Sequence, residues 1–281
     1  MWRKLYFQNE RFEQGIQRLL RSGIVQVSQG TGLIEPTGQS MDYNSNWLFF
    51  GNTTANRDCY LWHQIMFNHF DLVPEFCKMN CYKIVVKVRN FVEAIHLYNA
   101  MHTGPAVLAD LTLIHGKVGI DERYYSDGFF NGFIYCNGLE DALEKYAAVS
   151  ELVSANVDTS YAQSRGLPAE IPIIIKRSCT EFEQKYGATN NEFWSASTPD
   201  ERDLQNHIED IFVKQTVAAV QPDWLKNKII AKMTKWANTV GDKSWIEYFG
   251  LDFLTMKAVT YHETSVPKDS ATALTTPSKE D

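Results

Sequence analysis

Hydrophobic and polar residues alternate most clearly over residues 82–89. The apolar positions of this segment are Tyr82, Ile84, Val86 and Val88, and the basic positions between them are Lys83, Lys87 and Arg89. Successive side chains of a β-strand point to opposite faces, so this pattern predicts a strand with one apolar and one basic face.

Helical spacing is clearest near the N-terminus. Apolar residues three and four positions apart follow a possible N-cap, Asn9, at Phe12, Ile16, Leu19 and Leu20. Gly23 is suited to end this helix, because glycine readily adopts the left-handed conformation found at helix C-termini. The sequence also predicts a short strand before the helix, at residues 5–8, and an extended segment after it, at residues 24–27.

Shorter apolar segments predict the other elements. We expect strands at residues 47–50, 171–175 and 211–213, and helices at residues 54–70, 91–101, 139–153 and 222–236. Residues 28–46 are rich in Gly, Ser and Asn, which favours a long loop. Strands and helices are interspersed without regular βαβ spacing, which favours an α+β protein.

Composition narrows the class of protein. The chain has 281 residues, of which 44% are hydrophobic and 22% charged, and its net charge is −7. These values are typical of a globular protein with a sizeable core and exclude fibrous and wholly disordered classes. The acidic balance also argues against a basic nucleic-acid coat protein, whereas an enzyme acting on nucleic acid needs only a local basic groove. Residues 264–281 lack aromatic side chains and predict a disordered tail, so the expected folded domain is 1–263.

Two features indicate where the protein acts. No apolar run approaches the ~18 residues of a membrane span, so no membrane partner is expected. The first residues lack the apolar segment of a secretory signal, and an odd number of cysteines, five, is typical of reduced intracellular thiols. We therefore expect a cytoplasmic protein.

Motifs for metals and nucleotides are weak. Cys77 and Cys81 lie four residues apart, and Cys59 lies four before His63, but there is no second cysteine pair. A structural zinc site needs four ligands, usually in two short pairs, so buried thiols are favoured and no metal is expected. The chain also lacks GxGxxG, P-loop and GxSxG motifs, which argues against kinases, P-loop NTPases and α/β-hydrolases.

The order of several short segments resembles the ADP-ribosyltransferase superfamily, and within it the DarT-type toxins that modify nucleic acid. The matching features, spread over residues 4–236, are Gly23-Ile24 after the first helix, Phe50 at the end of a strand with Arg57 beyond it, Glu209 before residues 211–213, and Pro222 at the start of the following helix. The resemblance implies an α+β fold with a split, mixed β-sheet flanked by helices. Residues 91–200, longer than the family core needs, are expected to hold an insertion.

The resemblance also implies a site for NAD, the co-substrate that donates ADP-ribose. Its catalytic carboxylate is Glu209, or Asp210 if the residue immediately before the strand is the functional one. A carboxylate there can stabilise the positive charge that develops on the ribose as nicotinamide leaves. The guanidinium of Arg57 suits the pyrophosphate. The other candidates for binding NAD are Tyr6 and Gln8 on the first strand, which touches NAD in the family, and Phe50 and Tyr60 as stacking residues.

The activity implied by the resemblance is that of a mono-ADP-ribosyltransferase toxin acting on RNA or single-stranded DNA. Such a toxin of a toxin–antitoxin or phage-defence system would have an antitoxin protein as a partner. Three lysines at positions i, i+4 and i+7 of the helix at 222–236 share one face that can bind phosphates, Lys228, Lys232 and Lys235. Two alternatives stay open, namely the same chemistry on a protein side chain by a secreted effector, and a catalytically inactive interaction module.

Overall fold

The computed structural model describes residues 10–30, 34–37, 45–51, 61–103, 114–126, 128–212 and 221–250. The chain divides into two compact units, Met1–Trp245 and Ile246–Asp281, and the fold below is that of the first. Several predicted features lie outside the described residues, namely the strand at 5–8, the tail at 264–281, and the NAD-binding candidates Tyr6, Gln8, Arg57 and Tyr60.

An antiparallel β-sheet of five strands forms the centre of the fold, in the order β3-β5-β6-β4-β7. The strands are β3 Trp47–Phe50, β4 Cys81–Val86, β5 Gly116–Ile120, β6 Phe130–Asn137 and β7 Ile173–Arg177. The α+β class is therefore confirmed, whereas the expected mixed sheet is wrong, since every neighbouring pair of these strands is antiparallel. The reason is topological: each crossover helix joins two parallel strands that are separated by a third strand running the other way.

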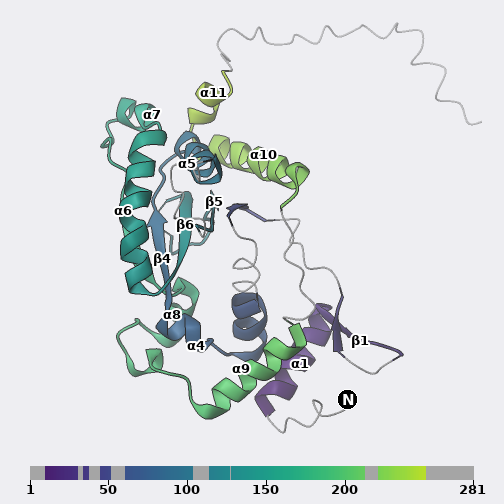
Figure 1. Ribbon diagram of the computed structural model, residues 1–281. Helices are drawn as coiled ribbons and strands as arrows, with labels where there is room; N and C mark the ends of the chain where they lie inside the picture. Colours follow the sequence, from purple (N-terminus) through teal and green to yellow (C-terminus); the bar gives the residue numbers. More distant parts are fainter. Residues whose placement is uncertain are drawn as a thin grey trace, which may run out of the picture. The chain divides into compact units, whose positions relative to one another are not determined.

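Those crossovers give the sheet a recognised topology. The chain runs β4, α5 (Phe91–Thr103), β5, β6, α6 (Leu139–Asn156) and β7, which is the split βαβ or ferredoxin-like arrangement, with β3 added beside β5. Figure 1 shows α5 and α6 beside the sheet. Residues 91–200, expected to hold an insertion, thus supply three of the five strands of the sheet.

The main core lies between this sheet and its helices. Alternate strand residues point into it, as the pattern at 82–89 predicted, with Ile84, Val86, Val118 and Ile134 fully buried against α5 and α6. α10, Asp223–Thr239, adds Leu225, Ile229 and Met233 to the same core. No helix among the described residues is both long and apolar enough to span a membrane.

A second apolar cluster joins the N-terminal part of the chain to a late helix. It contains residues of α1 (Glu10–Ser22), a π-helical turn η1 (Leu61–Phe67), α3 (Asn68–Phe70) and α9 (Pro199–Phe212). The predicted end of the first helix is confirmed, because Gly23 has a φ of 72°. Two short strands follow as an antiparallel pair, β1 (Val25–Val27) and β2 (Ile34–Pro36), the second inside the segment that we expected to be a loop.

Five short elements remain, namely α4 Glu75–Met79, α7 Ser160–Ser164, α8 Thr180–Tyr186, η3 Glu192–Trp194 and α11 Ser244–Tyr248. Of these, α4, α8 and η3 contribute buried residues to a third apolar cluster. Phe182 of α8 and Trp194 of η3 are buried there. This cluster lies beside the start of β4, because Cys81 belongs to it.

The predicted strand at 211–213 is wrong for its first two residues, because Ile211 and Phe212 form the last turn of α9, and residue 213 lies outside the described residues. Leu204, Ile208 and Phe212 are spaced four residues apart and all are buried. That helical spacing determines the structure, and it outweighs the β-propensity of a short apolar run.

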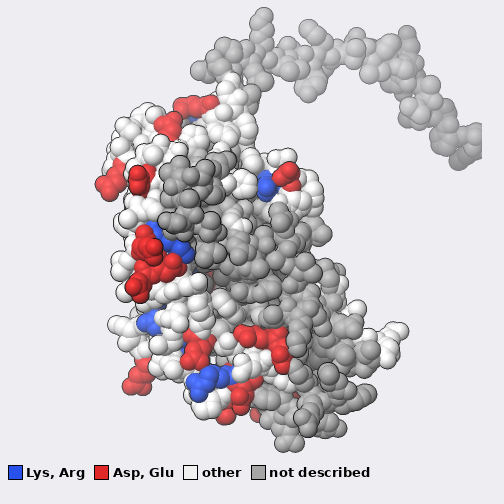
Figure 2. Space-filling model, viewed as in Figure 1, with Lys and Arg blue, Asp and Glu red and all other residues white. Residues whose placement is uncertain are grey.

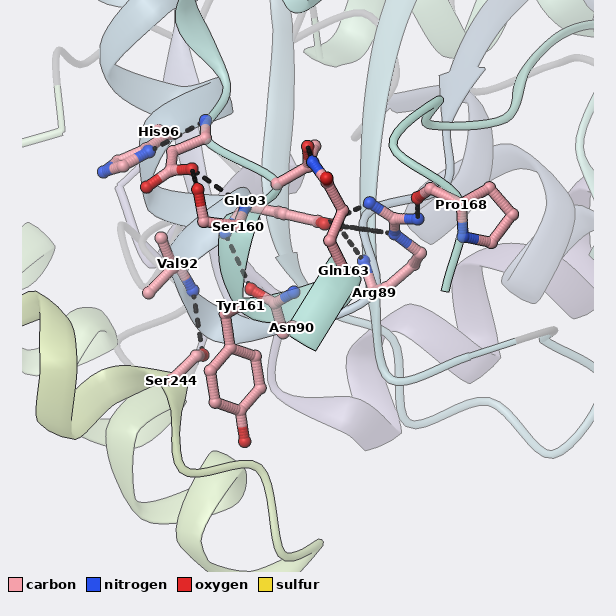
Figure 3. A network of polar contacts seen from close by, with 12 residues as sticks. Arg89, Asn90, Val92, Glu93, His96, Ser160, Tyr161, Gln163, Pro168 and Ser244 are labelled. Atoms are coloured by element: carbon pink, nitrogen blue, oxygen red, sulfur yellow. Dashed lines mark hydrogen bonds and ion pairs between the residues drawn. The ribbon is translucent and has the colours of Figure 1, made fainter. Parts of the chain in front are cut away.

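The N-terminus of α5 is held by the turn between α10 and α11. The backbone N–H of Phe91 donates to Asp242 Oδ2 at 2.7 Å, and that of Val92 donates to Ser244 Oγ at 3.2 Å. These acceptors satisfy N–H groups that have no partner within the helix. The turn is thereby fixed to the main core, as Figure 3 shows for Val92 and Ser244.

A buried ion pair completes this helix start. Glu93 is fully buried and accepts hydrogen bonds from Arg89 Nη2 at 2.5 Å, from Arg89 Nε at 3.0 and 3.1 Å, and from the backbone N–H of Arg89 at 2.8 Å. Arg89 also donates to the carbonyl of Pro168, so the pair links α5 to the segment before β7 (Figure 3).

Candidate functional site

The face of the sheet opposite α5 and α6, which we call the polar face, carries the most unusual set of side chains. Its residues alternate with the core residues along each strand and lie side by side in the strand register. They include Trp47, Lys83, Lys117, Asn131, Phe133 and Tyr135. The basic face predicted for residues 82–89 is thus confirmed at Lys83, whereas Lys87 and Arg89 follow the end of β4.

Arg123 binds two carboxylates at the edge of the polar face. Its Nε and Nη2 donate to the two oxygens of Asp121 at 2.5 and 2.6 Å, and its Nη1 donates to Glu181 Oε1 at 2.6 Å. The pairing with Asp121 is bidentate, the geometry in which a guanidinium binds a carboxylate most strongly. Asp121 also accepts a hydrogen bond at 3.1 Å from Asn131, so β6 supports the pair.

Glu181 is strongly acidic in this setting. Burial alone would raise the pKa of its carboxyl group, but the charge of Arg123 outweighs burial and lowers the pKa to about 2. The side chain is therefore ionised throughout the physiological range. It belongs to α8, which begins directly after the turn that follows β7.

His63 of η1 lies beside the same carboxylate. Its Nε2 is 4.0 Å from Glu181 Oε1 and has no hydrogen-bond partner among the described residues. The imidazole stacks on Phe182, with ring centroids 5.6 Å apart. Burial lowers the pKa of His63, although the charge of Glu181 opposes this effect, so the ring is neutral at pH 7.

Three cations surround one aromatic ring on the polar face. Lys83 Nζ, Arg123 Cζ and Lys117 Nζ lie 5.4, 5.7 and 5.8 Å from the centroid of Phe133. Lys117 also lies 4.4 Å from the ring of Trp47. Cations at this distance are attracted to the face of an aromatic ring, but three in one place also repel one another. The polar face therefore gathers three cations around one ring, of which the guanidinium of Arg123 is paired with the carboxylates of Asp121 and Glu181.

We expect acid to weaken the fold through Glu181. A carboxyl group whose pKa is about 2 when folded, and 4.5 as the reference value, contributes stability that is complete above pH 4.5 and is lost as the pH falls towards 2. Its size is about 3 kcal/mol at most. Denaturant unfolding of the Glu181→Gln variant between pH 2 and pH 7 should show a smaller decline in unfolding free energy on acidification than in the wild type. The Arg123→Met variant should behave similarly, and equal declines in all three proteins would contradict this account.

The predicted stacking residue Phe50 points into the main core. Its ring is only 2% exposed and packs among core residues, because Phe50 and its neighbour Phe49 face opposite sides of β3. Contact between Phe50 and nicotinamide would require this part of the core to open. The other NAD-binding candidates lie outside the described residues.

Glu209 and Asp210 lie on α9 rather than before a strand. Glu209 accepts a hydrogen bond at 2.9 Å from the side-chain amide of Gln205. The side-chain oxygen of Gln205 accepts in turn from the backbone N–H of Glu75 at 3.1 Å. Asp210 is exposed. The buried residues of α9 belong to the second apolar cluster, whereas Phe50 belongs to the main core, so the helix that carries Glu209 and Asp210 packs on a different cluster from Phe50.

The three predicted phosphate-binding lysines do share a helix, α10, which confirms the helix predicted at 222–236. Lys228 and Lys235 are exposed. Lys232 is half-buried and donates to Asn46 Oδ1. Its ammonium group is therefore already bound within the chain.

Sequence reasoning missed Asp121, Arg123 and Glu181, and it gave His63 no role beyond a weak metal motif. A signal existed for the first two, since acidic and basic residues follow one another directly after an apolar segment ending at Ile120. Nothing in the sequence connects that segment with Glu181, 58 positions beyond Arg123. No group of three or more metal-ligating side chains occurs in the described part of the chain, where Cys77, Cys81, Cys136 and Cys179 form no disulfide bond.

Comparison of the chain with protein-family models, with curated proteins and with solved structures finds no match in any of the three. The function proposed for the chain therefore rests on the geometry of the polar face and on the sequence resemblance.

Proposed function

We propose that this chain is an NAD-dependent mono-ADP-ribosyltransferase that binds NAD on the polar face of its sheet. The observation that carries the proposal is the meeting of Arg123, Glu181 and His63 beside aromatic rings. A guanidinium, an ionised carboxylate and stacking surfaces are the groups that this chemistry requires. The order of sequence segments that resembles DarT-type toxins supports the same reaction.

Glu181 is the carboxylate of this proposal. Positive charge develops on the ribose as the bond to nicotinamide breaks, and a fixed carboxylate nearby stabilises that charge. Its pKa of about 2 keeps Glu181 ionised for this role. Glu209 and Asp210, which the sequence favoured, remain the alternative carboxylates.

Arg123 and His63 have complementary roles in this proposal. The guanidinium of Arg123 is partly exposed, and the N–H groups that Asp121 and Glu181 do not use can donate to a phosphate of the donor. A neutral imidazole can accept a proton from the acceptor nucleophile, so His63 is the candidate general base. Tyr125, whose ring lies 5.4 Å from Arg123 Cζ, is a candidate to stack on a base of NAD.

The direct test is transfer from NAD carrying a label in its adenylate part. The purified full chain is incubated with single-stranded RNA, single-stranded DNA or cell protein, and the labelled acceptor is separated and counted. Label on a nucleic acid supports the proposal, and label on protein alone supports the side-chain alternative. Neither transfer nor release of nicotinamide would exclude both and favour a non-catalytic interaction module.

Binding of a nucleic acid as the acceptor requires a local basic surface on the protein. On the face seen in Figure 2, acidic and basic side chains lie close together, and no broad basic patch is visible among the described residues. Lys228 and Lys235, exposed on α10, are the residues for which binding to phosphates is proposed. An antitoxin protein that covers the polar face or α10 would block the reaction.

Removal of these lysines should change the salt dependence of RNA binding. Each lysine that no longer neutralises a phosphate flattens the slope of log binding constant against log salt concentration by about 0.7 for a single strand. The slope of the Lys228→Ala/Lys235→Ala variant should thus be flatter by about 1.4, measured by fluorescence anisotropy with a labelled single-stranded RNA at several salt concentrations. Lys226→Ala is the matched control, because Lys226 already pairs with Asp223 at 3.1 Å. An unchanged slope in the double variant would remove α10 from the acceptor site.

A further inference from the structure

Two cysteines meet where the sheet joins α8. Cys81 begins β4, and Cys179 directly precedes α8. Their side chains share a hydrogen bond, and neither cysteine forms a disulfide bond. The S–S bond of a disulfide is about 2 Å long, so two thiols in contact need only a small movement to form one.

An unusual backbone conformation brings the two thiols together. Ser178 lies opposite Cys81, and its backbone N–H donates to the carbonyl oxygen of Cys81 at 2.7 Å. In an extended strand the next residue, Cys179, would point to the other face of the sheet. Ser178 instead has a φ of 57°, in the left-handed region that residues other than glycine rarely adopt, and Cys179 contacts Cys81.

This conformation of Ser178 costs stability. The side chain is fully buried, and its Oγ has no hydrogen-bond partner among the described residues. Both a strained backbone and an unpaired buried hydroxyl are unfavourable. Such strain is concentrated at functional sites, and here it accompanies the contact between two thiols.

A cation lies beside the pair. Lys83, only 5% exposed, donates from Nζ to the Sγ of Cys179 at 3.5 Å. A hydrogen bond with Cys81 and burial hold the pKa of Cys179 well above its usual range, whereas the charge of Lys83 acts in the opposite direction. The thiol is therefore protonated at neutral pH, and the ammonium group stabilises the thiolate once the proton has left.

We propose that Cys81 and Cys179 are a redox-sensitive pair, which hydrogen peroxide converts to a disulfide bond with the help of Lys83. The Cys179 thiolate attacks one oxygen of the peroxide, so that an S–O bond forms, the O–O bond breaks, and hydroxide leaves and takes up the proton that the thiol has lost. The sulfur of Cys81 then attacks the sulfur of Cys179, and the hydroxyl group leaves as water with the proton of Cys81. Two thiols and one peroxide thus give one disulfide and two waters. A small oxidant suits this pair, because Cys81 is buried and Cys179 is only partly exposed.

Peptide mapping by mass spectrometry tests the pair in the purified full chain treated with hydrogen peroxide. The wild type should yield a peptide that links Cys81 to Cys179, and dithiothreitol should remove the link. Cys81→Ser and Cys179→Ser should each lose it. Cys136→Ser is the control and should form the link normally, because the Sγ of this buried cysteine contacts the carbonyl oxygen of Ile134 at 3.8 Å.

The position of the link decides the outcome. Cys77 belongs to the same apolar cluster as Cys81 and is the competing thiol among the described residues. A link from Cys77 to Cys81, or oxidation of single cysteines without any link, would overturn the proposal.

The rate of link formation tests the role of Lys83. Because the thiolate is the reacting form, the rate in the wild type should rise about 10-fold for each pH unit below the pKa of the thiol. Lys83→Met should form the link about 3- to 10-fold more slowly at pH 7, since the thiolate loses its neighbouring cation. Lys185→Met should match the wild type, because Lys185 is an exposed lysine of α8 that pairs with Asp71. A rate that does not change with pH, or that is equal in Lys83→Met and the wild type, would contradict the proposed mechanism.

The disulfide also bears on the candidate site, and in this respect the inference rests on the function proposed above. The backbone N–H groups of Phe182 and Glu183 donate to the carbonyl oxygen of Cys179 at 3.0 and 3.2 Å, so the start of the helix that carries Glu181 is tied to Cys179. Movement of Cys179 towards Cys81 should shift Glu181 and slow the release of nicotinamide from NAD about 10-fold or more. Peroxide should leave the rate of the Cys81→Ser variant unchanged.

The redox pair and the transferase activity can fail separately. A link between Cys81 and Cys179 in a chain that never releases nicotinamide retains the pair and rejects the function. Release of nicotinamide that is equally fast in the linked and the reduced chain retains the pair and rejects its effect on Glu181. Release by a chain in which no link forms rejects the pair and retains the function.

Discussion

The Glu181→Gln variant is expected to keep the fold and to transfer ADP-ribose at least about 100-fold more slowly than the wild type. Glutamine has nearly the same shape and retains an oxygen for Arg123, but it lacks the charge that stabilises a positive ribose. Loss of one stabilising or general-base group typically lowers the rate of the chemical step by about two to four orders of magnitude. The measurement is the initial rate of nicotinamide release and of label transfer from NAD, with folding checked by circular dichroism.

Variants of other carboxylates test whether the loss of rate is specific to Glu181. Glu183→Gln changes a carboxylate on the same helix that pairs with Lys176, and it should leave the rate near that of the wild type. Glu209→Gln and Asp210→Asn test the pair that the sequence favoured. A large loss in either of these two, with normal turnover in Glu181→Gln, would move the catalytic carboxylate to α9.

The largest effect on stability is expected from Arg89→Met. This change leaves Glu93 fully buried without its cation, and breaking a buried ion pair in this way costs about 3–5 kcal/mol. Figure 3 shows how closely Arg89 and Glu93 face each other at the start of α5. Urea unfolding monitored by tryptophan fluorescence measures the change in unfolding free energy.

The double variant Arg89→Met/Glu93→Leu separates the effect of the buried charge from that of packing. Replacement of both charges by apolar side chains of similar volume removes the uncompensated carboxylate, so more than half of the stability should return. A double variant as unstable as Arg89→Met alone would show that packing, and not charge, explains the destabilisation.

Much of the secondary structure was predictable from local patterns. The helices at 139–153 and 222–236 are observed as α6 and α10, because each has apolar residues at helical spacing and a clear start. β5 escaped prediction because Gly116 and Gly119 interrupt its apolar run. At Gly119 a Cβ would lie 2.0 Å from the carbonyl oxygen of Asn46, so the close approach of the chain entering β3 requires glycine. The glycine that makes β5 hard to recognise in the sequence is therefore required by the tertiary structure.

The candidate site was much less predictable. Arg123 and Glu181 meet only because β5 and the segment after β7 reach the polar face from distant parts of the sequence. Lys83 was recognised as part of a basic face, but its burial beside a thiol, Cys179, depends on what packs over β4. Such facts arise from long-range packing, which periodicity does not encode.

The strand order also has a consequence for how this protein is made. β4 lies inside the sheet, between β6 and β7, yet both of these partners come later in the chain. During synthesis the apolar strand Cys81–Val86 leaves the ribosome with both edges open, and its second edge stays open until residue 177 has emerged. Open strand edges invite pairing with other chains, so nascent chains that stall before β7 should aggregate or recruit chaperones. The nascent chain is thus prone to aggregation from the time Val86, the end of β4, emerges until Arg177, the end of β7, has been synthesised.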